Sequence, residues 1–200
     1  KDLKKNLYSN SKRPNAIPYV ASYYKKRWGF CLSHKQLIKL KKDTYRVKIK
    51  SNFKKGYLNY GEIKIPGKSK KEIFLSTYIC HPSMANNELS GPCVAIYLAK
   101  WIKSMSSRNY SYRIVFVPET IGSIAYLSKN LKYLKENIIG GYNLSCIGDD
   151  RQHSCMFSQY QNSISDKSLR DAYKNLNIRN YKIYSFLERG SDERQYNYPG

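Results

Sequence analysis

The sequence predicts an α/β fold in which a mostly parallel sheet is covered by helices. Two observations support this prediction. Residues 72–79 (EIFLSTYI) and 112–119 (YRIVFVPE) are nearly continuous apolar runs, a pattern typical of strands buried on both faces. Each run is followed by a segment with apolar residues at helical spacing. Strand and helix units therefore alternate along the chain, as they do around parallel sheets.

The first part of the chain has a different pattern, and we expect two parts: a basic N-terminal segment over residues 1–70 and an α/β core over residues 71–200. A short helix is expected through Leu37 and Leu40. Residues 45–67 (YRVKIKSNFKKGYLNYGEIKIPG) alternate apolar and polar positions on both sides of Lys55-Gly56. This alternation predicts a β-hairpin or a pair of edge strands, so the N-terminal appendage is expected to be rich in β-structure.

The core is expected to contain four strands and three helices. A helix is predicted over residues 91–105, where Val94, Tyr97 and Trp101 lie on one apolar stripe. The remaining predicted elements are a helix over 121–138, a strand over 140–148, a helix over 165–177 and a strand over 181–187. If these strands join one parallel sheet, their carboxyl ends meet at one edge, where ligands bind in open α/β sheets.

The distribution of charge bears on whether the chain binds a polyanion. The net charge is +22, and residues 1–71 hold 21 of the 36 Lys and Arg but only 3 of the 14 Asp and Glu. Such a segment could bind nucleic acid or another polyanion. A solvated basic surface is the simpler interpretation, because the basic residues are scattered and no nucleic-acid-binding motif accompanies them.

Two further observations concern the surroundings of the protein. No segment approaches the roughly 18 uninterrupted apolar residues of a membrane helix, so no membrane partner is expected. The five cysteines form no CxxC pair and are odd in number, which argues against both a disulfide framework and a thiolate zinc cluster. We therefore expect a cytoplasmic protein.

Polar side chains follow each predicted core strand. His81 follows the first strand, Glu119 the second, Asp149 the third, and Asp192 with Glu193 the fourth. Each has an ordinary explanation, such as a turn hydrogen bond for His81 or a helix cap for Glu119. Their joint placement at successive strand ends favours a site for a cation such as zinc, with imidazole and carboxylate ligands.

Several motifs resemble those of the zinc aminopeptidases that use two metal ions. ANNELSG (85–91) is similar to their Asp-Asn-x-Ser-Gly motif, and VPETIGS (117–123) to their Glu-Glu segment. YNLSCIG (142–148) and GSDERQY (190–196) are similar to their third-strand and SDxxxF motifs. Together with residues 16–31 (AIPYVASYYKKRWGFC), they resemble a family of bacterial aminopeptidase-like proteins that is often associated with surface-polysaccharide genes. The resemblance implies a three-layer zinc-exopeptidase-like fold.

The resemblance also implies a set of metal ligands. His81 would be the first zinc ligand, Asn87 stands where the family has a bridging Asp, and Glu88 stands where it has the following Asn. The third-strand ligand position falls on Ser145, with Asp149 as a displaced substitute. One zinc ion is better supported than two, because the amide of Asn87 brings no negative charge to bridge a pair of metals.

Glu119 is implied as either the general base or a carboxylate ligand, since Pro118 occupies the place of the family's second Glu. Ser191, Asp192 and Glu193 would shape the substrate pocket. The family's last His ligand lies downstream of this loop. Because the sequence reaches only Gly200, we expect the chain to be a piece of a longer protein.

Two functions remain open. The first is a zinc-dependent aminopeptidase-like hydrolase, in which metal-activated water and Glu119 cleave a peptide N-terminus or an amide on a modified sugar. The second is a catalytically inactive aminopeptidase-like protein that binds nucleic acid or an acidic polysaccharide through its basic N-terminal region.

Overall fold

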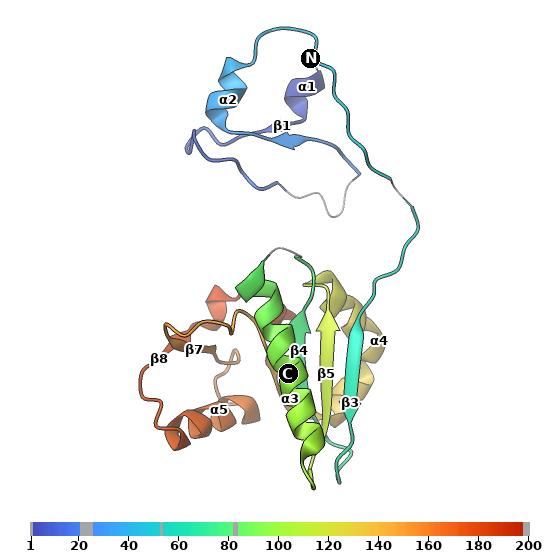
Figure 1. Cartoon of the computed structure of the whole chain (residues 1–200), viewed down its shortest axis with the longest axis vertical. Helices are drawn as coiled ribbons and strands as arrows, with labels where there is room; N and C mark the ends of the chain where they lie inside the picture. The colour runs from blue at the N-terminus through green and yellow to red at the C-terminus, as the bar shows by residue number, and fades with distance from the viewer. Residues whose placement is uncertain (1, 21–25, 53, 82–83, 198–200) are drawn as a thin grey trace. The chain divides into compact units, whose positions relative to one another are not determined.

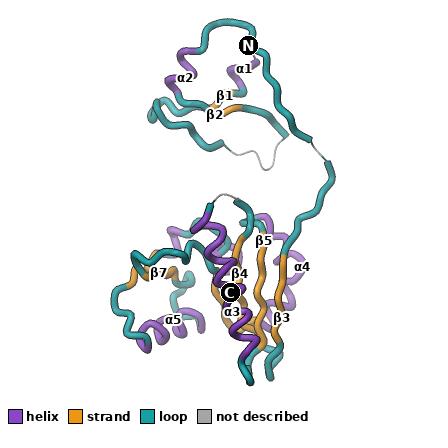
Figure 2. The backbone as a smooth tube through the Cα atoms, in the orientation of Figure 1, coloured by secondary structure: helices purple, strands orange, loops and turns teal. Residues whose placement is uncertain are grey.

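The computed structural model describes residues 2–20, 26–52, 54–81 and 84–197, and it divides the chain into two compact units. The first unit comprises Lys1–Lys55 and the second Gly56–Gly200. Figures 1 and 2 show the elements of both units. Within the described residues, no helix combines the length and apolar character that crossing a membrane requires.

The described residues of the first unit form four short elements. These are α1 (Asp2–Lys5), β1 (Leu7–Tyr8), β2 (Phe30–Cys31) and α2 (His34–Lys39). Strands β1 and β2 pair in parallel. The predicted short helix is present as α2, and Ser33 and Gln36 form a reciprocal capping box at its start.

The second unit is built on one four-stranded sheet. Its strands are β3 (Gly61–Ile65), β4 (Glu72–Tyr78), β5 (Ser111–Val117) and β6 (Ile138–Asn143), in the spatial order β3-β5-β4-β6. Strands β5, β4 and β6 are parallel, and β3 runs antiparallel to β5 at the edge. The mostly parallel sheet predicted from the sequence is confirmed.

Helices cover both faces of this sheet and complete three layers (Figure 1). Helix α3 (Ser90–Ser104) packs Ala95, Ala99 and Ile102 against one face. Helix α4 (Ile121–Asn137) packs Tyr126 and Leu134 against the other. Strands β4 and β5 are buried on both sides, which accounts for their apolar sequences.

The C-terminal part of this unit forms a separate small sheet. Strand β7 (His153–Met156) pairs in parallel with β8 (Tyr181–Tyr184), and helix α5 (Ile164–Asn175) connects them. The short helices η2 (Phe186–Glu188) and α6 (Glu193–Tyr196) follow. The prediction that the fourth strand, residues 181–187, joins the main sheet is wrong. Its two end residues are partly buried and its two middle residues are exposed, so it lacks the burial of a central strand.

The hairpin predicted over residues 45–67 is also absent. Its second half forms β3, which pairs with β5, but the described residues of its first half form no strand. Val47 and Ile49 are exposed there, so the alternating pattern has no apolar surface to cover. The chain divides between Lys55 and Gly56, at the predicted turn, whereas the boundary expected from the sequence falls at residue 70.

The loops after β4 and β5 diverge at one edge of the sheet, because α3 and α4 lie on opposite faces. Ligand sites in open α/β sheets lie at such a divergence. Glycines let both helices begin close to the strands. A Cβ on Gly91 would lie 2.3 Å from the carbonyl oxygen of Leu144, and one on Gly122 would lie 2.5 Å from Cδ of Pro118.

Candidate metal site

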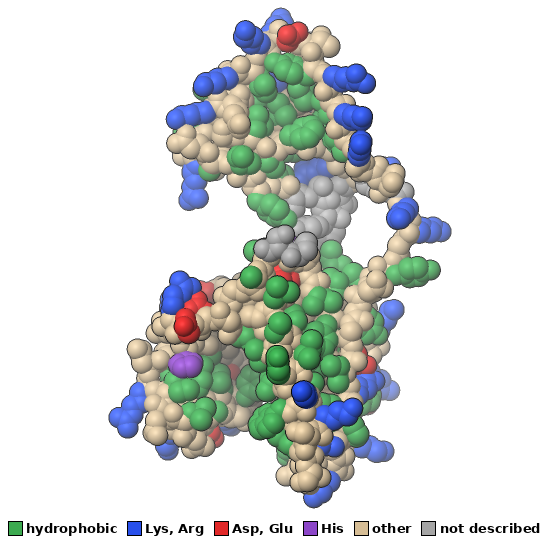
Figure 3. Space-filling model, in the orientation of Figure 1, with side chains coloured by type: hydrophobic (Ala, Val, Ile, Leu, Met, Phe, Trp, Pro, Cys, Tyr) green, Lys and Arg blue, Asp and Glu red, His purple; other side chains and the backbone are tan. Residues whose placement is uncertain are grey.

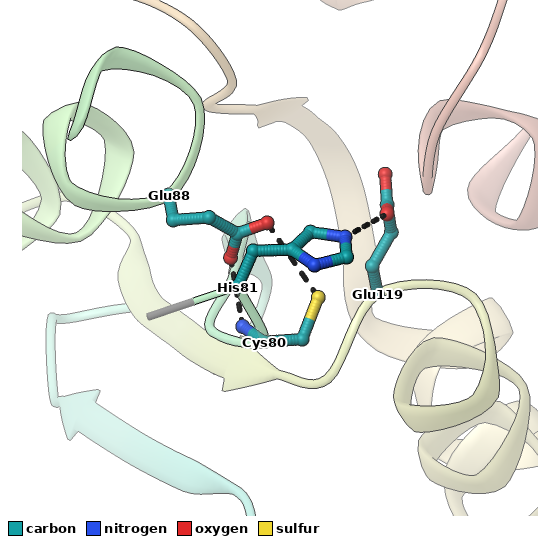
Figure 4. A group of neighbouring side chains, drawn as sticks. All are labelled: Cys80, His81, Glu88 and Glu119. Carbon is teal, nitrogen blue, oxygen red and sulfur yellow. Dashed lines mark hydrogen bonds and ion pairs between the residues drawn. The ribbon is translucent and has the colours of Figure 1, made fainter. Parts of the chain in front are cut away.

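Four potential metal ligands converge beyond the ends of β4 and β5 (Figure 4). Cys80 and His81 follow β4, Glu119 follows β5, and Glu88 belongs to the π-helix η1 (Ala85–Leu89) that leads into α3. One ligand atom from each residue lies within 4.8 Å of all the others. We call these four residues the Cys80 cluster.

The parallel register of β4 and β5 brings the cluster together. Tyr78 lies opposite Val117, and the amide of Ile79 donates to the carbonyl oxygen of Val117 over 2.9 Å. Continuing this register places Cys80 beside Glu119. The parallel pairing of two buried strands therefore fixes the distance between residues about forty positions apart in the chain.

Glu88 is the most buried member of the cluster, with 3% of its surface exposed. Its Oε2 accepts the backbone amide of Cys80 at 2.7 Å, and its Oε1 accepts the thiol at 3.6 Å. Partial burial of the thiol and the nearby charge of Glu88 raise the pKa of Cys80 to about 11, although a hydrogen bond with the Glu119 backbone opposes this. The thiol is therefore protonated at neutral pH, and its S–H group donates a hydrogen bond to Glu88.

His81 and Glu119 form the more open side of the cluster. Nε2 of His81 lies 3.9 Å from Oε2 of Glu119, and their side chains are 46% and 25% exposed. No described Lys or Arg forms an ion pair with Glu88 or Glu119. Two carboxylates thus share a small volume without a permanent cation, which is a favourable arrangement for a bound metal ion.

Hydrogen bonds join η1, which carries Glu88, and the start of α3 to the segment after β6. Oδ1 of Asn86 accepts the amide of Gly148 at 2.9 Å, and Oγ of Ser90 accepts the amide of Ile147 at 3.0 Å. The amide group of Asn87 donates to the sulfur of Cys146 over 3.4 Å. The side chain of Asn87 is therefore engaged with the β6 loop, and the acidic group that enters the cluster comes from position 88.

Two other residues assigned from the third strand lie outside the cluster. The carboxylate of Asp149 is paired with the guanidinium of Arg151, which lowers its pKa to about 2. The hydroxyl of Ser145 lies 2.6 Å from the hydroxyl of the buried Tyr78. Asp149 is not among the converging ligands, and the Ser145 hydroxyl is engaged with Tyr78.

The predicted pocket residues form a compact turn beside β6 and α4. Oε1 of Glu193 accepts the amides of Gly190 and Ser191 at 2.7 and 3.0 Å, and its Oε2 accepts Nδ2 of Asn143 at 3.3 Å. Asp192 is fully buried. In this structure Glu193 therefore orders the turn, and Asp192 is closed off from solvent.

Cys80 was missed by the sequence interpretation, which assigned no role to the residue before His81. A signal was available, since a thiol and an imidazole at the polar end of a buried strand are two ligand types that zinc prefers. Cys80, His81 and Glu88 could hold a zinc ion, because catalytic zinc sites have three protein ligands and leave one position open.

A three-layer α/β fold with a ligand cluster at the divergence of two parallel strands is the arrangement that the resemblance to aminopeptidase-like proteins implied. Residues 14–200 match the family described as a domain of unknown function, DUF4910, and the chain belongs to this family.

Two comparisons with known proteins agree with this membership. A Clostridium acetobutylicum protein named as a putative polysaccharide biosynthesis protein with aminopeptidase-like domain is 39% identical over 199 residues, covering 100% of this chain and 45% of that protein. The crystal structure of a putative peptidase from the same organism matches with a TM-score of 0.79 and 39% identity, covering 100% of this chain and 46% of that one. This chain therefore spans less than half the length of each. The aminopeptidase-like family and fold expected from the motifs are confirmed.

Proposed function

We propose that this protein is a zinc-dependent, aminopeptidase-like hydrolase that cleaves an amide bond. The observation that carries the proposal is the Cys80 cluster, in which a thiol, an imidazole and two carboxylates meet at the open edge of the sheet. The peptidase-like names of the relatives support the same class of reaction.

Within this proposal, Cys80, His81 and Glu88 hold one zinc ion and Glu119 is the general base. Glu88 is buried and already turned toward Cys80, as a ligand needs to be, whereas Glu119 is partly open to solvent. A bound zinc ion supplies Lewis acidity and lowers the pKa of a water molecule. Glu119 accepts a proton from the attacking water and passes it to the leaving nitrogen.

The position of Glu88 also addresses a departure from the aminopeptidase motif. The motif places an Asp at position 87, where this chain has Asn, and the neutral amide contacts Cys146. Glu88 is one residue further along the π-helix, and its longer side chain reaches Cys80. A carboxylate from position 88 can therefore supply the charge missing at position 87, and the four converging residues are enough for one zinc ion and a general base.

Two substrates fit this chemistry: a peptide N-terminus and an amide on a modified sugar. The relative named for polysaccharide biosynthesis gives the sugar amide its support. A functional thiol at Cys80 needs a reducing environment, so we keep the cytoplasm as the proposed location. The proposal involves no membrane and no nucleic acid.

The test measures zinc content and hydrolysis of aminoacyl amides and acylated amino sugars, comparing His81→Ala and Glu119→Gln with the unaltered chain. We expect one zinc per chain, no zinc in His81→Ala, and retained zinc with lost hydrolysis in Glu119→Gln. His153→Ala and Glu136→Gln are matched controls, because neither residue belongs to the cluster. A chain without zinc and without amidase activity would contradict the proposal.

The first unit supports a second candidate, binding of a polyanion. Lys and Arg side chains lie around this unit in Figure 3. It contains a hollow of about 610 Å³ whose lining includes Tyr8, Lys26, Arg27 and Trp28, and the Arg27 guanidinium lies 5.5 Å from the centre of the Tyr8 ring. Salt-dependent retention on heparin that falls in Lys26→Ala and Trp28→Ala would support this function. If both variants are retained as strongly as the unaltered chain, the hollow has no role in polyanion binding.

A further inference from the structure

The turn between β5 and α4, which presents Glu119, has an unusual backbone. Thr120 has φ 61° and ψ −66°, and the amide of Ile121 donates to the carbonyl oxygen of Glu119 over 2.7 Å. These features define a γ-turn whose central residue has positive φ, a rare and strained conformation. The strain is greater for a β-branched residue such as Thr, and it persists only where the surrounding structure holds the turn.

The side chain that holds this turn is Asp192. Its Oδ1 accepts the backbone amide of Thr120 at 2.7 Å and the hydroxyl of Ser123 at 2.9 Å. Ser123 lies in the first turn of α4 and is itself fully buried. One carboxyl oxygen thus fastens the strained residue and the start of the helix that follows it.

Asp192 is placed there at a cost to stability. None of its surface is exposed, and its Oδ2 has no hydrogen-bond partner in the described part of the chain. Burial raises the pKa of Asp192, and the charges of Glu119 and Glu193 raise it further. A half-satisfied buried carboxyl destabilises a fold, so stability alone does not account for it. Costly features of this kind cluster at functional sites.

We propose that Asp192 is a positioning residue that fixes the γ-turn at Thr120 and thereby directs the carboxylate of Glu119 toward His81. The proposal rests on the function proposed above, in which Glu119 acts as the general base. Asp192 touches neither substrate nor metal in this account. It acts through two hydrogen bonds on the backbone that carries Glu119.

The chain offers a matched control in Asp166. This aspartate is also buried, with 4% of its surface exposed, and it accepts the amides of Ser158 and Ser163 at 2.8 and 2.9 Å. Like Asp192, it also accepts serine hydroxyls. All of these partners belong to the segment around the start of α5, so Asp166→Ala removes a buried aspartate of the same kind without touching the Thr120 turn.

The first experiment measures kcat, KM and zinc content for Asp192→Ala, Asp192→Asn and Asp166→Ala. Asp192→Ala is expected to lower kcat about 10- to 100-fold with little change in KM or zinc content, because the base is misdirected but substrate and metal contacts remain. Asp192→Asn keeps an acceptor oxygen and retains most of the turnover. Asp166→Ala lowers the unfolding midpoint and leaves kcat unchanged. Wild-type kcat in Asp192→Ala, or an equal loss in Asp166→Ala, would overturn the proposal.

The second experiment separates this proposal from the proposed function, because it needs neither metal nor substrate. Hydrogen exchange of the Thr120 amide is measured in the metal-free chain. Loss of its acceptor in Asp192→Ala is expected to accelerate exchange at least about tenfold, whereas Asp192→Asn and Asp166→Ala leave it unchanged. An unaltered Thr120 exchange rate in Asp192→Ala overturns the positioning role, even in a chain that binds zinc and hydrolyses amides. Accelerated exchange in a chain without zinc or activity supports the anchoring of the turn and contradicts only the proposed function.

Discussion

Two groups of carboxylates lie at opposite ends of strands β4 and β5, and they differ in how their charge is balanced. At the start of the strands, Glu62 and Glu72 surround the buried guanidinium of Arg113, which we call the Arg113 cluster. Arg113 donates to Glu72 at 2.6 and 3.1 Å and to Glu62 at 2.5 Å, and Lys64 pairs with Glu62 at 3.1 Å. Two carboxylates there face two cations.

At the far end of the same strands, the Cys80 cluster also contains two carboxylates, Glu88 and Glu119, but no described Lys or Arg pairs with them. The difference shows how one sheet can hold a structural ion network at one end and a candidate site at the other. Where the cation is part of the chain, the charges stabilise the fold. Where the described chain supplies no Lys or Arg, the function proposed above has a cation from solution balance the charge.

The largest effect on stability is expected from removing the guanidinium of Arg113. Arg113→Met leaves Glu72 buried without its partner, so the free energy of unfolding should fall by about 3–5 kcal/mol. Chemical denaturation of the metal-free chain measures this change. Lys64→Met is the matched control, because this lysine is exposed and should change stability by less than about 1 kcal/mol. Equal stability of Arg113→Met and the unaltered chain would show that the Arg113 cluster does not stabilise the fold.

Removal of a carboxylate from the Cys80 cluster should act on metal binding instead. Glu88→Gln keeps an oxygen acceptor for the Cys80 amide, so the metal-free chain should lose no more than about 1 kcal/mol of stability. Zinc affinity should fall at least about 100-fold, the upper end of what residues outside the ligand shell contribute. Competition with a chromogenic chelator measures the affinity. A large loss of stability with unchanged zinc affinity would show that Glu88 stabilises the fold and does not bind zinc.

The Cys80 thiol should make zinc affinity depend on pH. The pKa of Cys80 is raised to about 11, so at neutral pH the thiol must release its proton to bind as a thiolate. Affinity should therefore increase with pH. In Cys80→Ser, the slope of log affinity against pH between pH 6 and 8 should be smaller by about one unit. Identical slopes would exclude Cys80 as a thiolate ligand.

The smallest effect concerns pH and the Arg113 cluster. Burial would raise the pKa of Glu62, but hydrogen bonds from Tyr126, Lys64 and Arg113 outweigh it and lower the pKa below the ordinary value. A lowered pKa in the folded state means that the ionised group adds stability above its unfolded pKa, and this stability is lost as pH falls through the folded pKa. The stability difference between Glu62→Gln and the unaltered chain should therefore shrink in acid. A difference that grows in acid would contradict the lowered pKa.

Much of the fold could be predicted because burial leaves a clear pattern in the sequence. The continuous apolar runs of β4 and β5, and the helical spacing in α3 and α4, predicted the central layers. The assignment of residues 181–187 to the main sheet failed because pairing depends on distant partners. Strand β7, which pairs with β8, is too short and polar to be predicted from residues 153–156 alone.

The candidate site could be predicted in part for the same reason. His81 and Glu119 follow strands that were correctly predicted, so their proximity follows from the parallel sheet. The contact of Asn87 with Cys146 and the pairing of Asp149 with Arg151 depend on loop conformations, which hydrophobic periodicity does not specify. The γ-turn held by Asp192 joins residues from two distant loops, and no local pattern predicts it.

The most direct test of zinc binding at the Cys80 cluster is whether zinc stabilises the folded chain. The unfolding free energy of the chelator-treated chain is measured with and without zinc, beside His81→Ala and with magnesium as the alternative ion. At a free zinc concentration 100-fold above the dissociation constant, the unaltered chain should gain about 2.7 kcal/mol. His81→Ala should gain far less, and magnesium should have little effect, since a thiol and an imidazole are poor magnesium ligands. No gain with zinc, or an equal gain in His81→Ala, would contradict a metal site at the Cys80 cluster.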